Sequence, residues 1–357
     1  MNIAALRLFL AALAVVPLIA GCSSEGSTVV DPNADKRAQI SLFAVNRSDT
    51  GELVRYSELT ETFDRNELQR ANGMPLDGPI DAIYNFETKL YLHQRDQGMI
   101  RVVDLQTRKL LGTVAGFPTK ADGRMCSMAF SNASQAWVVC QGSKNLYQVD
   151  LHANVISDTI PLPADPTFVG TIGTHVFVCM QLPDSTGQIG IMESNSGGVF
   201  TINKTLSVSS PVIFASPSTY ATDYFFLTSG TGSGTPAKMY YLNLETLDML
   251  YDLELGIVPL VNYIGMEPTY AAYTRTENLY LALPSAVVQI PFGGYPADWI
   301  PGYYPVLAAD PYSDLVYAAS PDSLQVKRRA YDGTDLPDLT APASIRSIFF
   351  LGVNRGE

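Results

Sequence analysis

Two cysteines, Cys126 and Cys140, have a spacing that could support covalent chemistry. They lie symmetrically about a turn at residues 131–134, on two apolar segments that we expect to pair as a hairpin. Facing residues in such a pair can bring their Cα atoms to about 4.5 Å, near the short end of disulfide geometry. Two interpretations stay open: a disulfide, which an oxidising compartment would permit, or two buried thiols that pack as small apolar groups.

The other candidates for catalysis or metal binding are scattered along the chain. Cys179 repeats the position of Cys140 in the next sequence unit, so we expect it to be a buried free thiol. His93, His152 and His175 fall in different segments, and they form no Ser-His-Asp order and no zinc-type spacing. We therefore predict no catalytic residue, no metal site and no cofactor.

Acidic or amide residues end three of the apolar runs, at Asp104, Asp150 and Asn243. A ring of carboxylates could bind calcium or transfer protons. Asp and Asn that begin a turn more often accept hydrogen bonds from the backbone N–H groups of that turn. We expect the two aspartates to cap turns.

Phosphate-bearing ligands are not expected. The glycine-rich stretch TSGTGSGTPAK (228–238) is followed by a strand-like run and not by a helix, so no helix N-terminus is available to hold a phosphate. The net charge of −12 would also repel a nucleic-acid backbone. The sequence therefore predicts no nucleic-acid partner.

An aromatic segment, FGGYPADWIPGYYP (292–305), is the best candidate for ligand binding. Its rings Tyr295, Trp299, Tyr303 and Tyr304 stand among prolines and glycines, and exposed rings on a stiff loop suit peptide or glycan recognition. The alternative is a loop that folds down over the edge of a sheet. A second loop, residues 256–268, should share the same face, so that Tyr263, Glu267 and Trp299 would rim one concavity.

The segments that must position these residues read as short strands in a repeating unit, best seen in residues 79–114. One strand recurs in every unit, at spacings of about 36 to about 54 residues, within the range of propeller blades. A proline opens the preceding strand in most units, where its missing N–H breaks no ladder hydrogen bond. The recurring strand reads ISLFAV (40–45), KLYLH (89–93), AWVVC (136–140), HVFVC (175–179), YFFLT (224–228), NLYLA (278–282) and DLVYA (314–318).

These units predict an all-β fold, a seven-bladed β-propeller of four-stranded blades. The first strand-like segment, QISLFAV (39–45), has no innermost strand before it, and the last, IRSIFFL (345–351), has no partner after it. We predict that the N- and C-terminal strands share one blade and so remove the open edges of the ring. Hydrophobic residues make up 46% of the chain, which is ample for such cores.

The runs MIRVVDLQTRKLLGTV (99–114) and LYQVDLHANVISDTI (146–160) resemble the third and fourth strands of YVTN-type, YncE-like propeller repeats. The segment MYYLNLETLDMLYDL (239–253) follows the same pattern, whereas IGIMESNSGG and VVQIPFGG depart from it. The resemblance covers most of residues 39–352 and implies a fold. Members of this group include binding scaffolds, assembly factors and a few enzymes, so it does not imply one activity.

The N-terminus resembles a bacterial lipoprotein signal. An apolar run, residues 8–19, ends in LIAGC at Cys22, which looks like a lipobox whose cysteine is lipidated before cleavage. The alternative, a short membrane-spanning helix, is marginal in length. We expect a signal peptide at residues 1–21, the lipidated Cys22 and a flexible tether at residues 22–38, and the propeller domain at residues 39–357. Ser23 follows the cysteine where Asp would signal retention in the inner membrane, so the resemblance implies the outer membrane.

The leading functional interpretation is a non-catalytic binding scaffold for a protein, peptide or glycan, anchored to the membrane by its lipid. A propeller-type hydrolase, lactonase or lyase with a site at the central channel is the main alternative, and an assembly factor for outer-membrane proteins is another. The predicted innermost strands carry few charges, among them Asp81, Asp310 and Arg346, which favours the scaffold.

Overall fold

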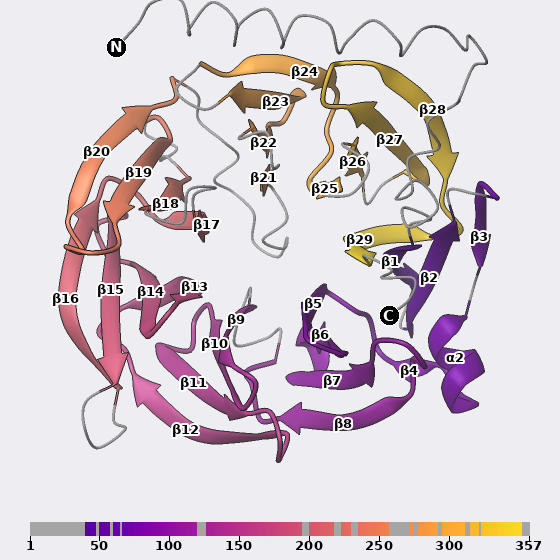
Figure 1. Cartoon of the computed structure of the whole chain (residues 1–357), viewed down its shortest axis with the longest axis horizontal. Coiled ribbons are helices and arrows are strands. Elements are labelled where there is room, and N and C mark those ends of the chain that lie inside the picture. Colours follow the sequence, from indigo (N-terminus) through magenta and orange to yellow (C-terminus); the bar gives the residue numbers. More distant parts are fainter. Residues whose placement is uncertain are drawn as a thin grey trace, which may run out of the picture.

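The computed structural model describes residues 40–47, 50–57, 60–64, 66–119, 126–194, 200–217, 223–229, 235–256, 271–273, 278–291, 295–310, 315–320 and 323–351. Its strands form seven antiparallel sheets arranged in a ring around a central axis (Figure 1). This is a seven-bladed β-propeller, as the sequence predicts. Within the described ranges, no helix is long and apolar enough to cross a membrane.

We number the blades in chain order, and the strands of each blade run outward from the axis. Blade 1 contains β5 (Ala82–Phe86), β6 (Lys89–Gln94), β7 (Met99–Asp104) and β8 (Leu110–Ala115), and blade 2 contains β9 (Cys126–Asn132), β10 (Gln135–Cys140), β11 (Asn145–Asp150) and β12 (Val155–Pro161). Blade 3 contains β13 (Asp165–Ile172), β14 (His175–Gln181), β15 (Gly187–Ser194) and β16 (Phe200–Val208), and blade 4 contains β17 (Val212–Pro217), β18 (Asp223–Thr228), β19 (Lys238–Asn243) and β20 (Met249–Glu254). Blade 5 contains β21 (Ala271–Tyr273), β22 (Asn278–Ala282), β23 (Ala286–Pro291) and β24 (Ala297–Pro301), and blade 6 contains β25 (Val306–Asp310), β26 (Leu315–Ala319), β27 (Gln325–Ala330) and β28 (Asp335–Thr340).

Blade 7 is built from both ends of the chain. Its innermost strand is the C-terminal β29 (Ser344–Leu351), followed outward by β1 (Ile40–Arg47), β2 (Thr50–Ser57) and β3 (Thr62–Asp64). The antiparallel ladder between β1 and β29 runs from Ile40 opposite Leu351 to Asn46 opposite Ser344. The predicted closure is therefore confirmed. We call the end of the ring where the innermost strands begin the upper end, and the end where β29 finishes and β1 begins the lower end.

The core is divided into seven hydrophobic clusters, one between each pair of adjacent blades. The second strand of a blade lies between two of these clusters, so both of its faces are covered. In β10, for example, Trp137 packs toward blade 3 while Val138 packs toward blade 1. This burial on both faces explains why the recurring strand is a continuous apolar run, whereas the outermost β12 is mostly exposed.

A short insertion links blade 7 to blade 1 on the outside of the ring. It carries α2 (Glu67–Asn72) and β4 (Leu76–Asp77), and β4 pairs with β2. Leu68 of α2 is buried in the cluster between the two blades, and Asn72 donates to the Arg108 carbonyl at 3.0 Å. The insertion thus fastens the last blade to the first.

Candidate functional site

The two cysteines of the hairpin are joined in the structure. Cys126 is the first residue of β9 and Cys140 the last of β10, and a disulfide connects them across a Cα–Cα distance of 4.0 Å. It closes the upper end of the inner hairpin of blade 2, and both residues are buried. Cys179 is a buried free thiol whose pKa is raised by burial, so it is a poor nucleophile.

The histidines do not converge on one site. His93 is the penultimate residue of β6 and is buried, and its pKa is lowered to about 4 by burial and by the nearby Arg95 guanidinium. His175 lies on blade 3, where its Nδ1 is 2.9 Å from Glu193, and His152 is exposed in a turn of blade 2. Among the described residues no group of three or more His, Cys, Asp or Glu side chains is placed to hold a metal ion.

Asp104 and Asp150 cap turns, as predicted, and Asn243 at the equivalent position does the same. Asp104 accepts hydrogen bonds from the backbone N–H groups of Gln106 and Thr107, at 3.0 and 2.7 Å. Asp150 and Asn243 make the equivalent pairs of bonds in blades 2 and 4. These bonds lower the pKa of Asp104 and of Asp150, so neither carboxyl is suited to take up a proton near neutral pH.

The aromatic segment does not form one exposed loop. Tyr295 precedes β24 at the lower end of blade 5 and is 79% exposed, whereas Tyr303 and Tyr304 follow β24 at the upper end and are half-buried. Trp299 lies within β24 and is only 8% exposed. The expectation that Trp299 rims a concavity is wrong, because its ring fills the space between blades 5 and 6. Tyr263 and Glu267 lie outside the described residues.

Trp299 is held between two neighbours. Its ring centroid is 4.4 Å from that of Tyr280 on β22, and the Arg329 guanidinium lies 5.2 Å from the indole ring on the side of blade 6. Arg329 also donates to the Trp299 carbonyl and, at 2.9 Å, to the Gly333 carbonyl. The tryptophan thus fixes the arginine between two blades.

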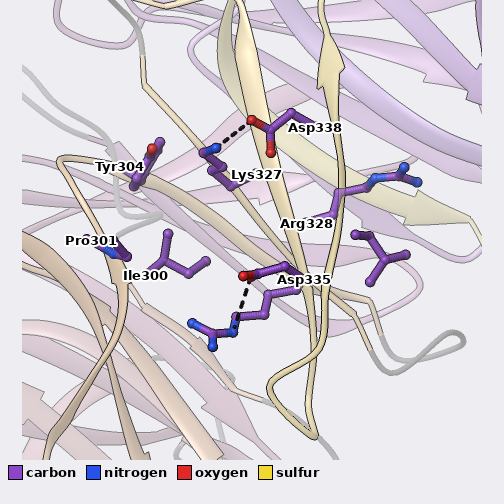
Figure 2. A pocket seen from close by; sticks show the side chains of 9 residues that line it. Ile300, Pro301, Tyr304, Lys327, Arg328, Asp335 and Asp338 are labelled. Atoms are coloured by element: carbon purple, nitrogen blue, oxygen red, sulfur yellow. Dashed lines mark hydrogen bonds and ion pairs between the residues drawn. The ribbon is translucent and has the colours of Figure 1, made fainter.

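A lateral groove opens beside this contact, between blades 5 and 6 (Figure 2). Its volume of about 400 Å³ is in the range of small-ligand sites. The blade 5 wall comprises Ile300 and Pro301 of β24 with Tyr304 beyond it, and the blade 6 wall comprises Lys327, Arg328, Arg329, Asp335, Leu336 and Asp338.

The groove carries both signs of charge. Lys327 Nζ lies 2.5 Å from Asp338 Oδ2, and Arg329 Nε lies 3.4 Å from Asp335 Oδ1. The bond to Asp338 raises the pKa of Lys327, with smaller contributions that include the hydroxyl of Tyr304. The Asp335 side chain is 80% exposed, so this carboxylate is the one that an incoming group could displace most easily.

Local backbone features point these side chains into the groove. The register between β27 and β28 shifts between Val326 and Arg328, because two residues of β28, Pro337 and Asp338, lie opposite the single residue Lys327. Val326 and Arg328 face blade 7, where Arg328 lies over the Tyr56 ring, so Lys327 and Arg329 face blade 5. Gly302 has a φ of 112°, and a Cβ atom there would lie 2.9 Å from the Tyr304 ring.

A second set of charges lies at the upper end of the axis. Asp81 directly precedes β5 and is buried; its Oδ2 accepts a hydrogen bond from the Arg95 backbone N–H at 2.7 Å, and its Oδ1 is 3.5 Å from Arg95 Nη2. Burial raises the pKa of Asp81, while Arg95 and Arg346 act to lower it. Asp310 is also buried, at the lower end of β25.

The charged wall of the groove was not predicted from the sequence. Its signal is the run KRR at residues 327–329, which is the only run of three basic residues in this acidic chain. The polar groups that line the groove, Lys327, Arg329, Asp335 and Asp338, could bind a ligand of either charge.

No known protein family's sequence profile matches the chain, and no curated protein matches it. Solved structures share its fold. A putative 6-phosphogluconolactonase from Bacteroides fragilis superposes with a TM-score of 0.62 at 12% identity, covering 88% of this chain and 98% of that one. A putative 6-phosphogluconolactonase from Bacteroides uniformis gives 0.62 at 14% identity, with 88% and 100% covered. A protein from Lactobacillus plantarum gives 0.61 at 12%, with 88% and 99% covered. At these identities the likeness establishes the propeller fold alone.

Proposed function

We propose that this chain is a non-catalytic β-propeller binding scaffold, held on the outer membrane through a lipid on Cys22, that takes a protein, peptide or glycan partner in the groove between blades 5 and 6. The observation that carries the proposal is the groove itself. It combines a volume of about 400 Å³, an aromatic wall at Tyr304 and two cation–carboxylate pairs, the mixture of apolar and convergent polar groups that ligand sites share.

The test is site-specific photo-crosslinking on the full-length chain in its native membranes. A photoreactive residue replaces Asp338, whose Oδ2 pairs with Lys327 on the groove wall. The matched control replaces Asp252 on blade 4, which pairs with Lys238 at 2.7 Å on neighbouring strands in the same way but does not line the groove. We expect a discrete adduct from position 338 that is lost in Lys327→Glu and absent from position 252. Equal adducts at both positions would contradict the proposal.

A second candidate is a hydrolase of lactones at the axis. What favours it is the fold shared with two putative 6-phosphogluconolactonases, together with a buried carboxyl, Asp81, whose pKa is raised. Against it, Arg95 occupies both oxygens of that carboxylate. Hydrolysis of a sugar lactone by the purified chain, lost in Asp81→Asn, would favour this candidate over the scaffold.

A further inference from the structure

Arg346 is a charge at an unusual place in the fold. It is the third residue of β29, the innermost strand of blade 7, counted from the upper end. In the ladder with β1, Ser347 pairs with Ala44 and Ile345 pairs with Val45, so Arg346 is the extra residue of a β-bulge. A bulge re-aims the side chain that it carries and is often found beside a functional site.

The side chain turns toward blade 1. Ile345, Ile348 and Phe350 of the same strand pack into the core shared with blade 6. Arg346 acts instead on Asp81, which stands at the start of β5 on the other side of β29. The guanidinium therefore lies on the side of β29 that meets β5, at the upper end of the axis.

Arg346 shares its nearest carboxylate with another arginine. Arg346 is half-buried, and it forms no ion pair or hydrogen bond with any residue in the described ranges. The carboxylate that it faces is already held on both oxygens by Arg95. The fully buried Arg108, by contrast, faces its own carboxylate, that of Glu67 at 3.6 Å.

We propose that Arg346 anchors an oxyanion-binding site at the upper end of the axis, for a small ligand that carries a phosphate or a carboxylate. A guanidinium presents a planar fork of donors that matches both groups. Neighbouring groups limit the affinity: Asp96 is exposed nearby and repels anions, and His93 is neutral near pH 7. The site is separate from the lateral groove and does not depend on what the groove binds.

The test is an anion titration of the full-length chain in low-salt zwitterionic buffer, with inorganic phosphate in one arm and acetate in the other. Heats of binding are measured together with the NMR shifts of the arginine Nε–H groups. We expect saturable binding of at least one anion, with the shift confined to one guanidinium. The arm that saturates identifies the group as phosphate or carboxylate.

Arg346→Gln should weaken binding about tenfold or more, as expected for the loss of charged hydrogen bonds, and Arg346→Lys should retain part of it. The matched control is Arg55→Gln, because Arg55 is a half-buried arginine of the same blade that lies on β2, away from the axis. The Arg55→Gln chain should bind the anion as tightly as the native chain does. If Arg346→Gln fails to fold, Arg346→Lys and the assigned Nε–H shift still decide the question. Absence of saturation in the native chain, or equal binding by the Arg346 and Arg55 variants, would overturn the proposal.

Discussion

The disulfide between Cys126 and Cys140 should contribute measurably to the stability of blade 2. The perturbation is the double substitution Cys126→Ala and Cys140→Ala, which removes the bond that ties the first residue of β9 to the last of β10. Both side chains are buried and small, so alanine leaves little empty space in the surrounding core.

The magnitude follows from the loop that the bond closes. A sequence separation of 14 corresponds to a closed loop of about 15 residues, and cross-linking such a loop removes unfolded-state entropy worth about 3 kcal/mol at 25 °C. With roughly 2 cal/mol/K of unfolding entropy per residue over a domain of about 300 residues, this corresponds to a fall in Tm of about 5 °C. The hairpin turn keeps the two strands close even without the bond, so we take this value as an upper bound.

The assay combines thiol counting with thermal unfolding. A Cys22→Ser chain, purified from an oxidising compartment without reductant and denatured, should show one reactive thiol, that of Cys179. Cys179→Ser serves as the control, because it should abolish that thiol and leave the disulfide in place. Three reactive thiols, or a double variant as stable as the native chain, would refute the reasoning.

Three further predictions concern stability. His93 is neutral in the folded chain, where its pKa is about 4, against 6.5 in the unfolded chain. The stability that neutral His93 contributes is therefore fully present above pH 6.5 and is lost as pH falls toward 4, a change of about 3 kcal/mol in the free energy of unfolding. Urea unfolding at several pH values should show that His93→Gln reduces this dependence on pH and that His152→Gln, at an exposed position, does not. Gly170→Ala would place a Cβ atom against the Tyr224 hydroxyl and should lower the free energy of unfolding, measured in urea, by about 1–3 kcal/mol. Gly190→Ala should lower it by less, because the atoms nearest to its Cβ, at 3.3 Å, belong to flexible side chains. Glu67→Ala leaves the buried Arg108 without its carboxylate and should lower the free energy of unfolding by about 3 kcal/mol. Lys109→Ala, at the exposed residue next to Arg108, should change the free energy of unfolding by less than about 0.5 kcal/mol. Equal losses in the two variants would contradict the ion-pair argument.

The fold could be predicted because the propeller repeats one physical solution seven times. Each second strand is buried on both faces, so runs such as AWVVC and HVFVC mark the blades even where loop lengths vary. The closure was visible as well, because QISLFAV and IRSIFFL are strands that would otherwise each lack a neighbour. The turn caps at Asp104 and Asp150 follow from local chemistry within four residues, which a sequence displays directly.

The candidate groove could not be predicted in the same way. It depends on which face of β27 carries Lys327 and Arg329, and that is decided by the neighbouring blade that each face of the strand meets. Trp299 was assigned to an exposed loop because its neighbours are prolines and glycines, whereas the cavity between two blades required a large ring at that position. Contacts between outer strands of different blades leave no periodic signal in the chain.

The shared construction of blade 7 has a mechanical consequence. A pull on the chain ahead of Ile40 loads β1 along its own length, and β1 is hydrogen-bonded on one side to β2 and on the other to β29. Because these bonds lie perpendicular to the strand, such a load stretches both ladders at once in shear and does not open them one bond at a time. The ring therefore has a strand that is hydrogen-bonded on both sides where a force from the N-terminal side would first arrive.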